Sequence, residues 1–134
     1  MNKNIAFSLA AIILVIAAAA AYSNKNSVVP AISVEDQALQ DNKVIISSVT
    51  AVDDSWLVIQ TETNNVPGPV IGSTKIKKGE NKNVSVVIDK NQATPKLFAM
   101  IHVDDGEKEK LDFPGADMPL IYKNEMVSKL FSLK

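Results

Sequence analysis

The chain has 134 residues, 14 of them basic and 15 acidic, and every basic residue is lysine. This length builds one domain, and the near-neutral charge without arginine argues against a protein that binds nucleic acid. Cysteine is absent, which excludes disulfides, thiolate nucleophiles, iron–sulfur clusters, zinc–thiolate sites and type 1 copper centres.

The chain begins with an apolar segment that is typical of membrane targeting. Residues 5–21 carry no charge and contain Ser8 as their only polar side chain. We therefore expect residues 1–23 to form a hydrophobic helix, either a cleaved signal peptide or an N-terminal anchor that contacts the membrane through residues 5–21. The small residues at its end suit cleavage, and its length suits an anchor. Both alternatives place the rest of the chain outside the cytoplasm, secreted or anchored to the membrane.

Residues 24–31 are predicted to form a linker and the start of a first edge strand, and residues 32–134 a β-sandwich domain. Pro30 lies within the apolar stretch 28–34, and proline cannot donate a hydrogen bond to a neighbouring strand. This strand therefore suits only the edge of a sheet. Residues 43–52 are rich in Val, Ile, Ser and Thr, which favours a second strand.

Residues 55–72 are the stretch around which the predicted sheet is organised. The apolar segment 56–59 directs side chains to both faces, as expected for a central strand. Trp56 is the only tryptophan, and we expect it to pack in the core rather than to stack on a ligand. Asn64-Asn65 and the run Pro67-Gly68-Pro69, which follow, predict a stiff turn that returns the chain to the core. Its structural residues are Pro67, Gly68, Pro69 and Gly72.

Residues 83–89 show the cleanest alternation in the chain. Val84, Val86 and Ile88 are expected to point inward, and Asn83 and Ser85 outward. The triplet Asn83-Val84-Ser85 matches the N-glycosylation acceptor pattern on this outward face. Such triplets also occur by chance, so both interpretations remain open.

The C-terminal third is predicted to hold a second central strand over residues 96–103. The pair Asp105-Gly106 predicts a tight hairpin with a returning strand over residues 108–113. A last strand is expected over residues 125–133. Between them, the turn residues Pro114, Gly115 and Pro119 exclude regular structure. The whole pattern predicts an all-β fold, an immunoglobulin-like antiparallel β-sandwich of about seven to nine strands preceded by the N-terminal hydrophobic helix.

Several motifs in residues 32–133 resemble those of an uncharacterised all-β domain family of extracytoplasmic and cell-surface proteins of archaea and some bacteria. They are Asp36-Gln37, SWLVIQTE from Ser55, PGPVIG from Pro67, Gly79, LFAMIHVDDG from Leu97 and FPGADMP from Phe113. The chain departs from the family at Ser55, where Gly is frequent, and at Gln60, where His is frequent. The resemblance implies a small surface module and carries no established activity.

The most suggestive chemistry lies between residues 102 and 117, where the only histidine is followed by six carboxylates. Such an oxygen-rich loop could bind Ca²⁺, with His102, Asp104, Asp112 and Asp117 as candidate metal ligands. The interleaved lysines also fit an ordinary solvated surface. A third interpretation is structural, with His102 hydrogen-bonded by Asp104 or Asp117 so that the loop is held in place.

Enzyme activity is not expected, because the sequence holds no G-x-S-x-G, no H-E-x-x-H and no phosphate-binding glycine loop. The predicted function is a noncatalytic extracytoplasmic module for cell-surface interaction, adhesion or envelope structure, without a cofactor. Its partners would be other surface proteins or envelope components. Two alternatives remain open: a small metal- or ligand-binding protein that uses the acidic loop, and a filament subunit that assembles by strand addition through its first edge strand.

Overall fold

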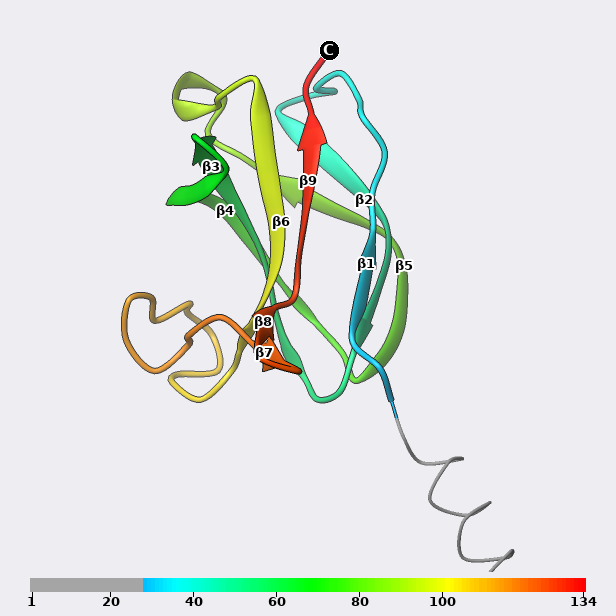
Figure 1. Ribbon diagram of the computed structural model, residues 1–134, viewed down its shortest axis with the longest axis vertical. Helices are drawn as coiled ribbons and strands as arrows, with labels where there is room; N and C mark the ends of the chain where they lie inside the picture. Colours follow the sequence, from blue (N-terminus) through cyan, green and yellow to red (C-terminus); the bar gives the residue numbers. More distant parts are fainter. Residues whose placement is uncertain (1–27) are drawn as a thin grey trace, which may run out of the picture.

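The computed structural model describes residues 28–134, which form an all-β domain (Figure 1). The predicted N-terminal helix, its cleavage and its contact with the membrane lie outside these residues. Within residues 28–134, no helix is long and apolar enough to span a membrane.

Most of the strands belong to two main antiparallel sheets. A three-stranded sheet has the order β1-β2-β5, a four-stranded sheet has the order β4-β3-β6-β9, and β7 and β8 form a separate hairpin. The elements are β1 (Ala31–Ser33), β2 (Lys43–Ala51), β3 (Ser55–Thr63), β4 (Val66–Ile76), β5 (Gly79–Val87), the 3₁₀ turn η1 (Lys90–Gln92), β6 (Lys96–Val103), β7 (Ile121–Tyr122), β8 (Glu125–Met126) and β9 (Ser128–Ser132).

The main core lies between the two large sheets. Leu57 and Ile59 of β3 and Ile101 of β6 contribute from one sheet, and Ile46 and Val86 contribute from the other. All five side chains are fully buried. Strand β3 lies between β4 and β6, which confirms its predicted central position. The predicted strand over residues 96–103 is also confirmed, as β6.

The turn after β3 is shorter than the sequence predicted, because it includes Asn64-Asn65 but not residues 67–69. Asn64 and Asn65 make the turn, with φ of 52° and 63°, a conformation that asparagine tolerates better than most residues. Residues 67–69 instead lie inside β4. This strand is at the edge of its sheet and its pairing with β3 is irregular there, so a proline costs no hydrogen bond to a further strand.

Gly72 was also predicted at a turn, and this is wrong, because it lies within β4 opposite Ile59. A side chain at Gly72 would collide with the backbone carbonyl of Val87. The glycine is therefore needed for the close approach between β4 and the end of β5, where the two sheets meet at one edge.

Residues 104–120 form one long irregular loop, which we call the 104–120 loop. The predicted hairpin at Asp105-Gly106 and its returning strand over residues 108–113 are absent. The backbone N–H groups of Asp105, Gly106 and Asp112 instead bond to the carboxylate of Asp117. A side chain has thus replaced the strand ladder that the local sequence favoured.

The strands at the two ends of the domain are shorter than predicted. β1 begins at Ala31, directly after Pro30, and it is an edge strand as expected. The predicted last strand is divided into β8 and β9. Beyond the end of β1, the side-chain amide of Gln37 pairs with β2. Its oxygen accepts from the N–H of Ile45, and its nitrogen donates to the carbonyl of Ile45. The backbone of Gln37 also pairs with the end of β9, which connects the two sheets.

Candidate functional site

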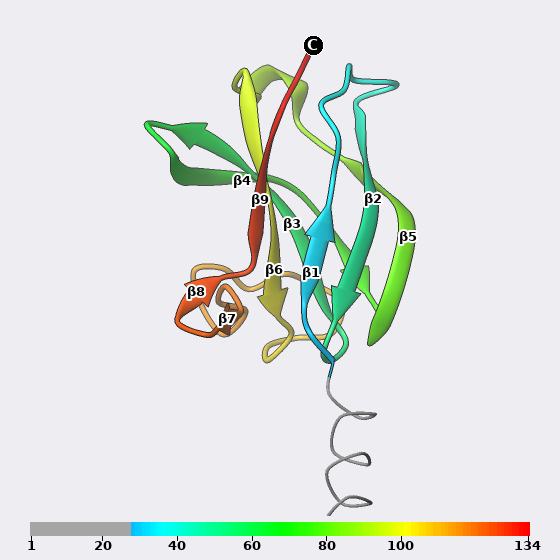
Figure 2. The same ribbon diagram turned by 45° about the vertical axis from the view of Figure 1, so that its right-hand side comes forward.

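The outer face of the four-stranded sheet is unusually apolar, and the 104–120 loop lies against it. Trp56, Met100 and His102 point to this face, away from the main core, and all three are buried. The ring of Phe113 packs edge-on against the ring of His102, with 4.7 Å between centroids. The burial predicted for Trp56 is confirmed, although it belongs to this second apolar layer and not to the main core cluster. Figures 1 and 2 show the loop beside the lower half of β6.

Asp117 organises the loop from its centre. The residue is fully buried, and its Oδ1 accepts hydrogen bonds from the N–H groups of Asp105 and Gly106, each at 2.8 Å. Its Oδ2 accepts from the N–H of Asp112, also at 2.8 Å. Three charge-assisted bonds to backbone donors fix both ends of the loop. The central residue of the loop is therefore Asp117 and not His102.

His102 is fully buried and both of its ring nitrogens have a polar neighbour. Nδ1 lies 2.8 Å from the backbone carbonyl oxygen of Asp117, and Nε2 lies 3.2 Å from Oε1 of Gln60. Because a carbonyl only accepts, Nδ1 carries the hydrogen and donates it. The Gln60 amide nitrogen already donates to the carbonyl of Gly68 at 2.9 Å, so its oxygen faces Nε2. Only the imidazolium can donate to both acceptors.

Burial nevertheless keeps this histidine neutral. Loss of hydration lowers the pKa of His102 below its ordinary value of 6.5, against the opposing effects of the Asp117 carbonyl and carboxylate. Burial also opposes ionisation of Asp117, but the three backbone donors and His102 outweigh it and hold the pKa of Asp117 below 3.8. The pair is thus a neutral imidazole beside a carboxylate.

Asp104 is the second buried carboxylate of the region, and its surroundings differ. Its side chain is 1% exposed, and its Oδ2 lies 3.0 Å from Nζ of Lys75 and 3.7 Å from Nζ of Lys108. Neither oxygen accepts a bond with hydrogen-bond geometry, and Oδ1 has no ion-pair partner either. The indole nitrogen of Trp56 is also buried without a partner. The ammonium of Lys75 lies 5.2 Å from the centre of the Trp56 ring, which adds a cation–π interaction.

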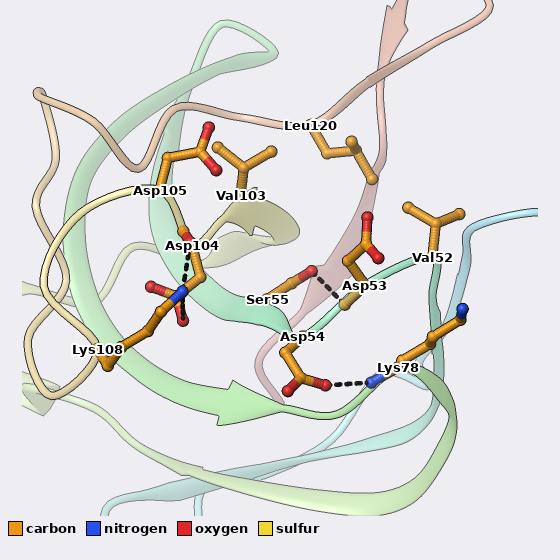
Figure 3. Close-up of a pocket in the computed structure, with 10 residues that line it drawn as sticks. All are labelled: Val52, Asp53, Asp54, Ser55, Lys78, Val103, Asp104, Asp105, Lys108 and Leu120. Atoms are coloured by element: carbon orange, nitrogen blue, oxygen red, sulfur yellow. Dashed lines mark hydrogen bonds and ion pairs between the residues drawn. The ribbon is translucent and has the colours of Figure 1, made fainter.

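Asp104 lines an open pocket of about 460 Å³ at the end of the domain (Figure 3). The turn between β2 and β3, the connection between β4 and β5 and the end of β6 form its walls. Its polar lining residues are Asp53, Asp54, Ser55, Lys78, Asp105 and Lys108 together with Asp104. Asp54 accepts a bond from the backbone N–H of Lys78 at 2.9 Å, and Ser55 donates to the carbonyl of Asp53 at 2.6 Å. These two bonds fix the shape of the pocket wall.

The structure does not bring the four predicted metal ligands together. His102 and Asp117 already have hydrogen-bond partners, and Oδ2 of Asp112 accepts from the N–H of Ala116 at 3.2 Å. Asp104 faces lysines instead. In the part of the chain that the structure describes, no group of three or more acidic or histidine side chains is arranged to hold a metal ion.

The remaining predicted residues have structural positions or lie elsewhere. Gly115 is required because a side chain there would collide with the carboxylate of Asp112. Pro119 pairs with His102 in an isolated bridge, and Pro114 follows a cis peptide bond. Asn83 is exposed on β5, far in sequence from the loop, with a φ of 50°. Its glycosylation stays a prediction.

Sequence reasoning missed the lysine and glutamine partners of the site. Gln60 lies on β3, the neighbour of β6, and Lys75 lies on β4, one strand farther from His102 and Asp104, which local patterns cannot reveal. Cross-strand pairing of Trp56 with both His102 and Lys75 supplies the connection.

The fold and the site together define a small all-β domain in which a long loop closes the outer face of one sheet and borders an acidic pocket. The sequence matches the Domain of unknown function (DUF7282) over residues 30–133. This match covers most of the chain, and the protein therefore belongs to that family. No curated protein and no solved structure matches it.

Proposed function

We propose that this chain is a noncatalytic extracytoplasmic module that acts by binding at the cell surface. The main support for this proposal is that two buried polar side chains already form hydrogen bonds within the domain. His102 and Asp117, the residues most suggestive of chemistry, contact the backbone and side chains that hold the 104–120 loop. The loop is a rigid support for the adjoining pocket, which is the property of a binding surface.

The N-terminal apolar segment supports the location outside the cytoplasm, and the strand order supports an immunoglobulin-like fold. One sheet combines β1, β2 and β5, and the other combines β3, β6 and β9, as in immunoglobulin domains. The fourth strand pairs with β3 and not with β5. Domains of this architecture present binding residues on the loops at their ends, and the pocket of Figure 3 has that position.

The two alternatives from the sequence receive less support. Strand addition through β1 would use a strand of three residues, which offers few backbone groups to a neighbour. Metal binding would require the loop carboxylates to exchange their present partners for an ion. Binding of an organic ligand or partner in the pocket requires neither change.

Two measurements test this proposal. The first is the accessibility of a C-terminal epitope tag to external protease in cells that express the full chain, and the second is binding of the purified chain to isolated envelopes. The C-terminus lies at the end of the domain opposite the 104–120 loop (Figure 1), so the tag leaves the pocket open. We expect external protease to remove the tag from intact cells, and the purified chain to bind isolated envelopes saturably. A tag that is cut only after lysis, or adsorption that never saturates, would contradict the proposal.

A further inference from the structure

We propose that the pocket of Figure 3 binds the cationic side chain of a partner protein, an arginine or a lysine, through Asp104, and that Lys108 covers this carboxylate until the partner arrives. The inference rests on the proposed binding function and names the chemistry of the partner.

The first step is the unsatisfied state of Asp104. A buried carboxylate normally accepts several hydrogen bonds, because loss of its hydration is otherwise uncompensated. Here neither oxygen accepts one, and Oδ1 also lacks an ion pair. The indole nitrogen of Trp56 has no acceptor in the same layer. A guanidinium carries five donors in a planar fork, which is the kind of group that would satisfy such a carboxylate.

The second step is the difference between the two lysines that face Asp104. Lys75 belongs to the fixed structure, since its ammonium lies 3.0 Å from Oδ2, beside the Trp56 ring, and donates to the carbonyl of Lys108. The side chain of Lys108 is 71% exposed, and its ammonium lies farther from Oδ2, at 3.7 Å, while it donates to the backbone carbonyl of Asp104 at 3.2 Å. Asp104 is buried, but the exposed ammonium of Lys108 can exchange both contacts for water, so the pair contributes less to stability than a fully buried one. A partner can therefore displace Lys108 more easily than Lys75.

The third step is the charge of the pocket. Four carboxylates line it, those of Asp53, Asp54, Asp104 and Asp105, together with the ammonium groups of Lys78 and Lys108. Lys75 adds a third ammonium group 3.0 Å from Asp104, which leaves a difference of one negative charge. Among the residues drawn in Figure 3, no interaction reaches the carboxylates of Asp53 and Asp105. The pocket thus keeps uncompensated negative charge beside Asp104, which attracts a cation.

The spacing of the acidic side chains favours an organic cation over a metal ion. The acidic side chains within residues 28–134 do not gather into a group of three or more that could hold a metal. They are spread over the pocket wall, on the turn after β2 and at the end of β6. A guanidinium or ammonium on a long side chain can reach Asp104 while its stem passes between the other carboxylates.

The test uses the ¹⁵N-labelled full chain in mild detergent and two matched peptides, acetyl-Gly-Arg-Gly amide and the same peptide with citrulline, which is isosteric and neutral. We expect the arginine peptide to shift the amide signals of Ser55, Asp105 and Gly106 saturably, and the citrulline peptide to leave them unchanged. Equal shifts from both peptides, no shifts from either, or full displacement of the arginine peptide by millimolar Ca²⁺ would overturn the inference.

Two exposed lysines make a matched pair of variants, because the side chains of Lys108 and Lys82 are both 71% exposed and both lie near a carboxylate. Removal of the covering lysine by Lys108→Gln should lower the Kd of the arginine peptide by about two- to fivefold. The control Lys82→Gln should leave it unchanged. Weaker binding by Lys108→Gln would contradict the covering role. Asp53→Asn, at an exposed position, should weaken binding without threatening the fold.

The failure of this inference can be told apart from failure of the proposed function. Saturable binding of the chain to envelopes, together with no response to the arginine peptide, would overturn only the cationic partner. Absence of both would overturn the surface-binding function itself.

Discussion

Two buried carboxylates in the same loop have opposite surroundings. The carboxylate of Asp117 accepts three backbone hydrogen bonds of 2.8 Å, whereas the carboxylate of Asp104 accepts none and forms ion pairs with two lysines. The first arrangement is complete within the chain, and the second is not. The difference shows that one loop can contain a carboxylate that is fully hydrogen-bonded to the backbone and another that contacts only lysines.

The largest expected effect comes from removing each carboxylate in turn. Asp117→Ala leaves three buried N–H groups without an acceptor, and we expect it to lower the free energy of unfolding by about 3–5 kcal/mol. Asp104→Ala removes no hydrogen bond and leaves Lys75 able to reach water, so about 1 kcal/mol is expected. Urea denaturation of both variants gives the comparison. Equal losses would mean that the two sites are energetically alike.

A glycine substitution tests how rigidly the 104–120 loop is held around Asp117. Gly115→Ala places a methyl group against the carboxylate of Asp112, and we expect a loss of about 1–3 kcal/mol from the forced shift. Gly106→Ala is the milder control, since its methyl group would lie 3.2 Å from Cβ of Asp112. Thermal unfolding should rank Gly115→Ala as the less stable variant. The reverse order would show that the loop yields at residue 115.

A falling pH should lower the stability of the domain in two stages, first through His102 and then through Asp117. The pKa values of His102 and Asp117 lie below their ordinary values of 6.5 and 3.8, so the unfolded chain binds protons more readily than the folded one. Stability is therefore highest above pH 6.5, falls as the pH is lowered through the pKa of His102, and falls again below pH 3.8 as Asp117 is protonated.

The pH dependence can be assigned because His102 is the only histidine of the chain. In His102→Gln, the decline in unfolding free energy between pH 7.5 and pH 5 should disappear, while the decline at lower pH remains. Stability that rises in wild type as the pH falls from 7 to 5 would show instead that the imidazolium, bonded to both Gln60 and Asp117, is the favoured form.

The smallest effect on stability is expected for a substitution of Lys108, which lies beside Asp104. Lys108→Gln removes an exposed ammonium that lies 3.7 Å from Oδ2 of Asp104 and donates to the backbone carbonyl of Asp104. Its effect on the free energy of unfolding should stay below about 1 kcal/mol. A loss as large as that of Gly115→Ala would mean that Lys108 is a structural partner of Asp104 and not a removable cover.

The sequence predicted the strands better than the loop, and the reason is physical. Strand β6 and the central position of β3 follow from apolar side chains on both faces, which is a local signal. The contacts of Asp117 with Asp105 and Gly106 join residues that are 12 and 11 positions apart, and no periodicity records them. The local preference of Asp105-Gly106 for a hairpin therefore lost to a distant carboxylate.

The sequence indicated which residues belong to the candidate site, but not which side chains they would contact. The sequence drew attention to the residues between 102 and 117, and one of its open interpretations gave them a structural role. Their partners Gln60 and Lys75 come from other strands, and the pocket wall at Asp53 comes from a turn between sheets. Such neighbours depend on cross-strand register and on the packing of the sheets, which the sequence of one element does not contain.

Amide hydrogen exchange across the 104–120 loop tests the central claim most directly, namely that Asp117 holds this loop as a rigid support for the pocket. We expect the amides of Asp105, Gly106 and Asp112 to exchange slowly, close to the limit set by global unfolding, and those of Glu109 and Lys110 to exchange rapidly. Equal, rapid exchange at all five amides would show that the carboxylate of Asp117 does not hold the loop, and the account would be wrong.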